Sequence, residues 1–444
     1  MASSSAGSSA AEPPPAWTDP SQATRNFLTL GAYQALLRVG WIFKTESVII
    51  PAFLDRMAGP AWLRGLLPVL NRAGQSVPPL LLANWVQRLP QKKRGVTLCT
   101  LLMTAGLLGM SALWLVHHQE QPRWLAAAFL ACYFGFFSAH GVSQLCYNTL
   151  QSKVIAPTRR GRLLLCSDVV GTLVAVAFAL WLLAPWLALP GGGFDRVFTF
   201  AGCVFLLAAF VPALAREPRL AGEMVKHDST AHAGGGVLSL LRGDRNFRRL
   251  AAVTALFSTV QILFPHYQAL ALTRLGLPPV SMLGWVVAQN LSVGLFSLVA
   301  GNVSDRYGTL LSLRLLIVCG ALSPLVALGI ASAGAEAAQA WYWVVFVPVG
   351  FTPLAMKTLN LYTLEIARPG QEAHYLSAVS LALALPFVVS PGVGWLVDHL
   401  GFAPVFLCGA AVILTAGLLT FRLIEPRTRL PLAAAESSEG LEFD

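Results

Sequence analysis

The most constraining feature of this 444-residue sequence is a series of long apolar stretches. A helix needs about 20 mostly apolar residues to cross the hydrocarbon core of a bilayer. Only 12% of the residues are charged, whereas soluble domains carry about 25%, so the chain must present apolar surface to lipid. We predict an all-α membrane protein with twelve spanning helices, at residues 27–54, 62–87, 95–116, 123–149, 163–189, 196–214, 249–273, 280–302, 310–332, 339–364, 374–397 and 402–423.

The distribution of Lys and Arg predicts the orientation of the chain. Most of the 31 Lys and Arg residues lie in the two tails and in the even-numbered loops between spans. Five lie on the opposite side, namely Arg56, Arg64, Arg123, Arg196 and Arg274. Because cytoplasmic loops are enriched in Lys and Arg, we expect both termini in the cytoplasm. The multi-pass protein would reside in a bacterial inner membrane or a plasma membrane.

The longest polar stretch between two spans divides the chain into six spans plus six. It covers residues 216–248 and contains three consecutive glycines, at 234–236. The N-terminal residues are rich in Ser, Ala and Pro and lack the apolar core of a signal peptide, so we expect them to be disordered. The expected organisation is a tail at 1–26, a six-helix bundle at 27–215, a cytoplasmic linker at 216–248, a second bundle at 249–424 and a tail at 425–444.

Two short motifs occur once in each half of the chain. Ala83-Asn84-Trp85-Val86-Gln87-Arg88-Leu89-Pro90 follows the second span, and Gly301-Asn302-Val303-Ser304-Asp305-Arg306-Tyr307-Gly308 follows the eighth. Arg216-Glu217-Pro218-Arg219 ends the sixth span, and Ile424-Glu425-Pro426-Arg427 ends the twelfth. Both pairs are about 210 to 220 residues apart, as an internal repeat requires. We therefore expect two similar, pseudo-symmetric six-helix bundles in parallel orientation.

The octapeptide from Gly301 to Gly308 resembles the signature G-x-L-A-D-R-x-G of the major facilitator superfamily. The first copy departs from it, since Ala83, Gln87 and Pro90 replace Gly, Asp and Gly. The resemblance implies a secondary transporter in which Asp305 faces the N-terminus of span five and holds the cytoplasmic side closed, since a helix N-terminus attracts a carboxylate. The implied cytoplasmic gate comprises Gln87, Arg88, Gly301, Asp305, Arg306 and Gly308. The alternative is that this loop is only a tight turn with topogenic charge.

Polar and ionisable residues inside spans are costly and are candidates for function. In the family fold, spans one, four, seven and ten line the central cavity, and the polar residues concentrate in those spans. His140, Gln144 and Asn148 lie four apart on one helix face, which indicates either a cavity wall or hydrogen bonds between helices. The candidate substrate or proton pathway comprises Arg38, Lys44, Glu46, Arg72, His140, Gln144, Asn148, Gln261, His266, Lys357 and Asn360.

Glu46 is the clearest carboxylate inside a span and could carry a coupling proton. The alternative is a structural ion pair with a neighbouring base, although Lys44 is two positions away and would point to the opposite face of a helix. Asp168, near the start of span five, is expected to pair with a base such as Arg162. Four bases, Arg38, Lys44, Arg72 and Lys357, outnumber Glu46. This excess predicts an electropositive cavity and an anionic or carboxylate-bearing substrate.

Other classes of protein fit the sequence less well. The motifs HxxxxD, HExxH and GxSxG are absent from usable contexts, which argues against a membrane enzyme. A sensor or scaffold that does not transport remains an alternative, because the first gate motif is degraded. None of the seven cysteines forms a CxxC or a Cys/His cluster, so we expect neither a metal site nor a cofactor. The expected partners are the lipid bilayer, a small-molecule substrate and protons. We expect the protein to be a monomer and not to bind nucleic acid.

Overall fold

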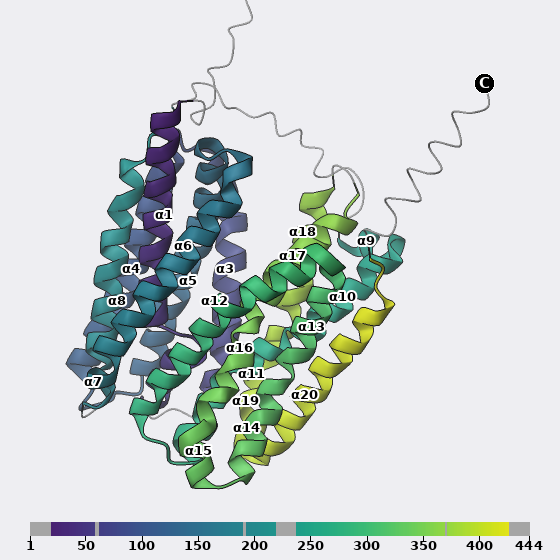
Figure 1. The fold of residues 1–444 in the computed structure, drawn as a ribbon. Helices are drawn as coiled ribbons and strands as arrows, with labels where there is room; N and C mark the ends of the chain where they lie inside the picture. Colours follow the sequence, from purple (N-terminus) through teal and green to yellow (C-terminus); the bar gives the residue numbers. More distant parts are fainter. Residues whose placement is uncertain (1–18, 58–61, 190–191, 219–236, 369–370, 426–444) are drawn as a thin grey trace, which may run out of the picture.

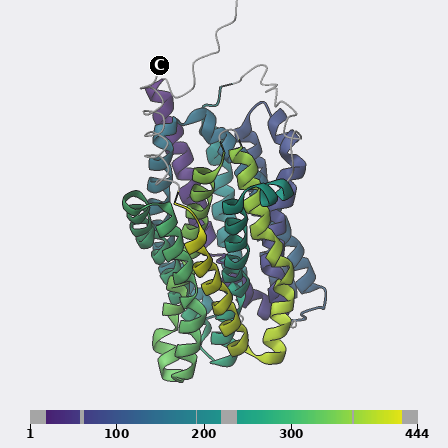
Figure 2. The same ribbon diagram turned by 90° about the vertical axis from the view of Figure 1, so that its right-hand side faces the viewer.

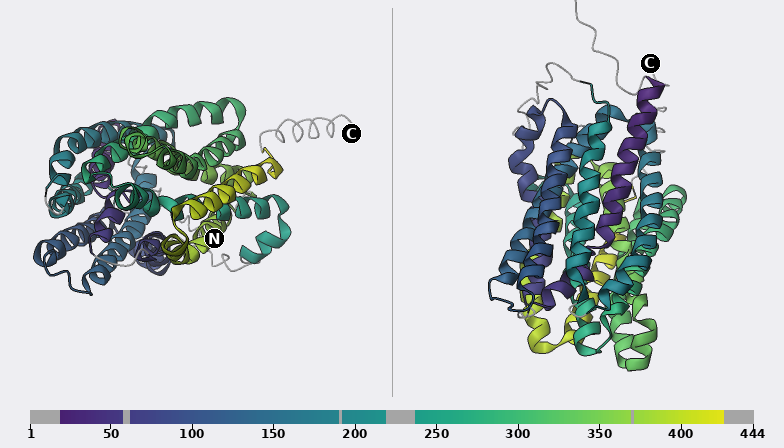
Figure 3. Two further views of the ribbon diagram at one scale, coloured as in Figure 1. Left: turned by 90° about the horizontal axis from the view of Figure 1, so that it is seen from below. Right: turned by 90° about the vertical axis from the view of Figure 1, so that its left-hand side faces the viewer.

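The computed structural model describes residues 19–57, 62–189, 192–218, 237–368 and 371–425. The helices run roughly parallel to one long axis, and those of the two halves diverge toward the end where α1 begins (Figure 1). Figure 2 views the second half from its outer side, and Figure 3 gives an end-on view. The first half contains α1 (Pro20–Ile42), α2 (Ile49–Asp55), α3 (Trp62–Arg88), α4 (Lys92–His117), α5 (Leu125–Val154), α6 (Pro157–Phe178), α7 (Ala184–Leu187) and α8 (Phe194–Phe210).

The second half repeats this plan with more interrupted helices. Its sixth span, the twelfth of the chain, is α20, and α10 with α11 forms the seventh span. The helices are α9 (Val237–Gly243), α10 (Arg245–Phe257), α11 (Thr259–Ala269), α12 (Met282–Tyr307), α13 (Thr309–Gly320), α14 (Leu322–Ser332), α15 (Ala335–Trp341), α16 (Phe346–Val349), α17 (Phe351–Ile366), α18 (Glu372–Ala384), α19 (Ser390–Leu400) and α20 (Phe402–Leu419).

Among the described residues, ten helical segments are long and apolar enough to cross a membrane. They correspond to spans three to twelve. The first span is interrupted between α1 and α2, and the second, α3, carries a run of polar side chains that lowers its hydropathy. The predicted single helix at 27–54 is therefore wrong in detail, because two shorter helices occupy that range.

Two of the predicted boundaries also differ from the structure. The helix α1 begins at Pro20, inside the expected tail, because Asp19 caps it by accepting a hydrogen bond from the Ser21 backbone N–H at 2.9 Å. Asp at the N-cap followed by Pro at the first helical position is a typical helix start. The expected linker contains α9, and residues 1–18, 219–236 and 426–444 lie outside the described part of the chain.

Helices within each half pack closely against one another. In the first half α4 packs on α5 and α8, α3 on α5, and α1 on α6; in the second half α10 packs on α18 and α20, and α13 on α17. Contacts between the halves include α3 with α19 and α12 with α6. The exact division at 215/216 and 248/249 stays a prediction.

The repeated Glu-Pro motif has the same structural role in both halves. The Glu217 carboxylate accepts hydrogen bonds from the backbone N–H groups of Lys92 (2.8 Å) and Lys93 (3.0 Å), at the start of α4. The Glu425 carboxylate accepts one from the Leu310 backbone N–H (3.1 Å), at the start of α13. The first N–H groups of a helix have no partner within the helix and carry partial positive charge. Each glutamate therefore fixes the end of its half's last span to the start of its third span.

Candidate functional site

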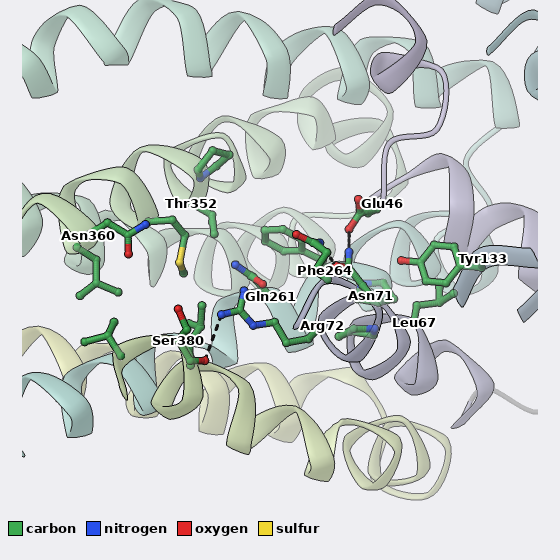
Figure 4. Close-up of a pocket in the computed structure, with 18 residues that line it drawn as sticks. Glu46, Leu67, Asn71, Arg72, Tyr133, Gln261, Phe264, Thr352, Asn360 and Ser380 are labelled. Atoms are coloured by element: carbon green, nitrogen blue, oxygen red, sulfur yellow. Dashed lines mark hydrogen bonds between the residues drawn. The ribbon is translucent and has the colours of Figure 1, made fainter. Parts of the chain in front are cut away.

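A cavity of about 370 Å³ lies between the two halves, and Figure 4 shows the residues that line it. Its walls come from α3, α5, α11, α17 and α18, together with the interruption between α1 and α2. Spans one, four, seven and ten thus contribute, as do spans two and eleven. The cavity is lined by Glu46, Leu67, Pro68, Asn71, Arg72, Gln75, Tyr133, Gln261, Phe264, Pro265, Thr352, Pro353, Met356, Leu359, Asn360, Val379, Ser380 and Leu383.

The interruption of the first span brings Glu46 to the cavity. The helix α1 ends at Ile42, and the Thr45 hydroxyl donates to the freed Ile42 carbonyl at 2.6 Å. The helix resumes as α2 at Ile49, and Pro51 lacks the N–H that would otherwise bond the Ser47 carbonyl. The local sequence therefore favours a short non-helical segment at this point.

Lys44 and Glu46 form an ion pair, with 3.0 Å between Lys44 Nζ and Glu46 Oε1. The expectation that they would point apart is wrong, because it assumed a continuous helix and both residues lie in the interruption. Lys44 is 1% exposed, whereas Glu46 is 26% exposed. The Lys44 ammonium also lies over three aromatic rings, at 3.5 Å from Trp41, 4.3 Å from Phe137 and 4.5 Å from Phe136.

Two carboxamides of α3 extend this polar network along the cavity wall. Asn71 Nδ2 donates to the second Glu46 oxygen, and Gln75 Nε2 donates to Asn71 Oδ1. The helices α3 and α5 approach closely here, since a Cβ added to Gly74 would meet Phe137 at 2.9 Å and one added to Gly141 would meet the Gln75 carbonyl at 2.7 Å. Such small-residue contacts between membrane helices hold Asn71 and Gln75 beside Glu46.

Arg72 is the cation that lines the cavity itself. Its Nη2 donates to the Ser380 backbone carbonyl at 3.2 Å, across the cavity on α18 (Figure 4). Its Nε is buried and has no hydrogen-bond partner in the described part of the chain. Arg72 makes no ion pair with any described carboxylate. Because Lys44 offsets the charge of Glu46, Arg72 leaves the cavity with excess positive charge.

Four of the predicted pathway residues line the cavity: Glu46, Arg72, Gln261 and Asn360. Arg38 instead reaches α6, where its Nε donates to Thr172 Oγ1 at 3.3 Å. The imidazole of His140 packs on the Trp41 ring, with 4.7 Å between ring centroids. The remaining residues, Lys44, Gln144, Asn148, His266 and Lys357, are absent from the lining of this cavity.

Asp168 pairs with Lys357, not with Arg162. The distance between Lys357 Nζ and Asp168 Oδ2 is 3.1 Å, and the two side chains are 65% and 47% exposed. The pair joins α6 of the first half to α17 of the second. The prediction named a cytoplasmic-end base such as Arg162, close to Asp168 in the sequence, whereas the partner lies 189 residues away.

The predicted cytoplasmic gate is only partly described. The side chains of Gln87 and Asp305 lie outside the described residues, and Arg88, Gly301 and Arg306 are exposed. Gly308 has a backbone φ of +98°, and a Cβ there would meet the Glu425 carboxylate at 2.7 Å. Gly308 is therefore required both by the left-handed turn and by the close approach of that carboxylate.

Five polar residues that line the cavity were not predicted from the sequence: Asn71, Gln75, Tyr133, Thr352 and Ser380. A signal was present for two of them, because Asn71 and Gln75 lie four apart on one face of a span that also carries Arg72. Within the described residues, no three His, Cys, Asp or Glu side chains are grouped to hold a metal ion.

Comparison with known proteins agrees with this architecture. The family model of the Major Facilitator Superfamily matches residues 65–391. The solved structure of a variant of the nucleoside transporter NupG is similar, with a TM-score of 0.68 and 12% identity over 90% of this chain and 100% of that chain. No curated protein matches the sequence.

Two further solved structures extend the likeness. A bacterial homologue of the iron transporter ferroportin, in an inward-facing state, has a TM-score of 0.64 and 14% identity over 90% of this chain and 98% of that chain. The E. coli fucose:proton symporter FucP has a TM-score of 0.57 and 14% identity over 90% and 98%. The predicted fold class, twelve transmembrane helices in two six-helix bundles, is confirmed.

Proposed function

The chain belongs to the Major Facilitator Superfamily, and from this premise we propose that it moves a small organic anion across the membrane by alternating access. The family and its structural neighbours are those of secondary transporters. In such proteins two bundles rock about a site near the membrane midplane. The cavity between the halves is that site in this proposal, and a carboxylate-bearing solute is the substrate class.

The charge of the cavity is the observation that carries the proposal. The two charges of Lys44 and Glu46 compensate each other at 3.0 Å. The Arg72 guanidinium has no described carboxylate partner, and its buried Nε retains an unused N–H donor. A planar guanidinium binds carboxylates through charge-assisted, often bidentate hydrogen bonds. An anion in the cavity would supply the acceptors that Arg72 lacks.

The remaining lining restricts what else the solute can carry. Carboxamides and hydroxyls at Gln261, Asn360 and Thr352 offer both donors and acceptors, whereas Phe264 and Met356 offer apolar surface. A volume of about 370 Å³ lies at the lower end of the range of about 300 to 1,000 Å³ for small-molecule sites. These features favour a small solute with one anionic group, further polar groups and an apolar part.

Glu46 is the proposed proton carrier. It lies at the cavity and an incoming anion would oppose its negative charge, so that proton and anion are favoured together. The aromatic rings around Lys44 support such a change, because they continue to stabilise the ammonium when Glu46 becomes neutral. Protonation would therefore not leave Lys44 without a favourable environment.

The proposed orientation places both termini in the cytoplasm of a bacterial inner membrane or a plasma membrane, with the protein as a monomer. The Lys and Arg distribution supports this orientation. The end opposite the termini is where α3 and α19 approach closely, since a Cβ on Gly65 would meet the Ser390 carbonyl at 2.4 Å. Under this orientation the chain is closed toward the outside.

Binding to Arg72 variants tests the proposal. Purified protein would be screened by thermal shift against mono- and dicarboxylates, amino acids and nucleosides, since a ligand of the folded state raises its stability. For the stabilising carboxylate, we expect Arg72→Gln to weaken binding by about ten- to a hundredfold, the effect of one charge-assisted hydrogen bond. Arg72→Lys, which keeps the charge, should lose less. Stabilisation by neutral solutes alone, with equal affinity in Arg72→Gln, would refute an anionic substrate.

A further inference from the structure

A second polar cluster lies beyond the cavity, toward the end of the molecule opposite the termini, and is separate from the cavity lining. Asp55 at the end of α2 pairs with Arg64 on α3, with 2.6 Å between Asp55 Oδ1 and Arg64 Nε. On the other side of the interface, Gln268 of α11 donates from Nε2 to Asp55 Oδ2 at 2.9 Å. One carboxylate therefore holds a cation of its own half and a neutral amide of the opposite half.

The cluster is buried directly beyond the cavity. The side chains of Arg64 and Asp55 are 11% and 19% exposed, and Gln268 is 0% exposed. Arg64 precedes the lining residue Leu67 by one helical turn, and Gln268 follows Phe264 by one turn, which is about 5.4 Å along each helix. The cluster thus lies between the cavity and the end of the molecule opposite the termini.

Backbone packing reinforces the same closure. Gly65, next to Arg64, brings α3 within 2.4 Å of the Ser390 carbonyl as measured from an added Cβ, so only glycine fits. His266 of α11 is fully buried in this region. In addition, α3 contacts α19 and α11, and α2 contacts α11. The region is therefore a packed contact between α2 and α3 of one half and α11 and α19 of the other.

We propose that Asp55, Arg64 and Gln268 form the outer gate of the transport cycle, with Gln268 as the group that engages and releases. This inference rests on the proposed transport by alternating access. Asp55 and Arg64 move together when the outer side opens, because both belong to the first half. The bond from Gln268 to Asp55 must then break. A neutral donor suits this role, since separating it from Asp55 exposes no unpaired charge, whereas breaking a buried ion pair would.

A cysteine reporter in the cavity tests the gate without any substrate. Ser380→Cys is nearly isosteric, and only the backbone carbonyl of Ser380 bonds Arg72. A membrane-impermeant maleimide is added to intact cells from outside, and labelling is measured against the protein without Ser380→Cys. Gln268→Met keeps the side-chain length and removes the donor. We expect it to increase outside labelling of the reporter about tenfold, the effect expected for losing one hydrogen bond to a charged group.

Gly65→Ala provides a second, independent opening variant, because its methyl group would collide with the Ser390 carbonyl. It should raise outside labelling in the same direction as Gln268→Met. Two controls should label like the parent. Arg56→Gln removes an exposed charge beside Asp55, and Gly392→Ala adds a methyl to α19 where nothing lies within 4 Å. Gel filtration establishes that each variant is folded.

The outcomes separate the gate from the proposed function. Parent-like labelling of folded Gln268→Met would overturn the gate, as would a parent that is already labelled rapidly from outside. Increased labelling in Gln268→Met and Gly65→Ala, with both controls unchanged, would support it. If labelling shifts as expected but reconstituted protein carries no carboxylate, the gate stands and the proposed substrate class fails.

Discussion

Replacing Lys44 by methionine gives a quantitative test of the buried ion pair beside the cavity. Methionine keeps the length of the side chain, and its thioether packs well against the aromatic rings that now surround the ammonium. The variant loses the positive charge that pairs with the Glu46 carboxylate. We therefore expect Lys44→Met to be folded but less stable than the parent.

The expected loss follows from the geometry of the pair. Two unit charges 3.0 Å apart attract by about 5.5 kcal/mol at an effective dielectric constant of about 20. Glu46 is 26% exposed to the cavity, so solvation recovers part of that energy when Lys44 is removed. Removing one partner of a buried pair costs about 3–5 kcal/mol, and the exposure of Glu46 places this case near 3 kcal/mol.

The complementary variant should cost less. Glu46→Gln still offers an amide oxygen to the Lys44 ammonium, which also keeps its three aromatic contacts, so we expect a loss of about 1 kcal/mol. In Lys44→Met/Glu46→Gln no charge remains buried, and the two effects should fall short of additivity by about 2 kcal/mol. Unfolding of the detergent-solubilised proteins, followed by tryptophan fluorescence, measures the parent and the three variants. Additivity within about 0.5 kcal/mol would refute a direct ion pair.

Three further predictions follow from the charged contacts. Glu46→Gln should abolish uphill, pH-driven uptake into proteoliposomes while substrate exchange persists, because exchange needs no net proton movement; uphill uptake by this variant would remove Glu46 as the proton carrier. Glu217→Gln should lower stability by about 1–2 kcal/mol, since its two bonds to the α4 N-terminus lose their charge, and an unchanged melting temperature would contradict this. Lys357→Gln should change stability by less than about 1 kcal/mol, because its pair with Asp168 is exposed; a larger loss would indicate a buried role.

Much of the fold could be predicted from the sequence. Each span must form its backbone hydrogen bonds within its own helix in the bilayer, and it is therefore recognisable as a long apolar run. Ionisable residues stand out against such runs for the same reason, and Glu46 and Arg72 could be predicted on that basis. Neutral amides cost less to bury than charged groups, so Asn71 and Gln75 were not predicted as site residues, although both line the cavity.

The errors in the sequence analysis have two physical origins. The Lys44–Glu46 pair was excluded by helical periodicity, which does not apply where Thr45 and Pro51 favour an interruption of the helix. The predicted partner of Asp168 was close to it in the sequence, although a side chain between two bundles can reach a residue of the opposite half, here Lys357. Contacts between distant spans depend on how each helix is rotated about its axis, and no local pattern records that rotation.

The placement of these contacts indicates which parts of the chain would move relative to one another in a conformational change. Glu217 and Glu425 use ionised carboxylates to join helices of the same half, and such charge-assisted bonds are about twice as strong as neutral ones. Between the halves, the Asp168–Lys357 pair is exposed, and Gln268 reaches Asp55 and Arg72 reaches the Ser380 carbonyl through one hydrogen bond each. Because the exposed pair costs little to separate and the other two contacts are single hydrogen bonds, motion of two rigid bundles is favoured over deformation within either bundle.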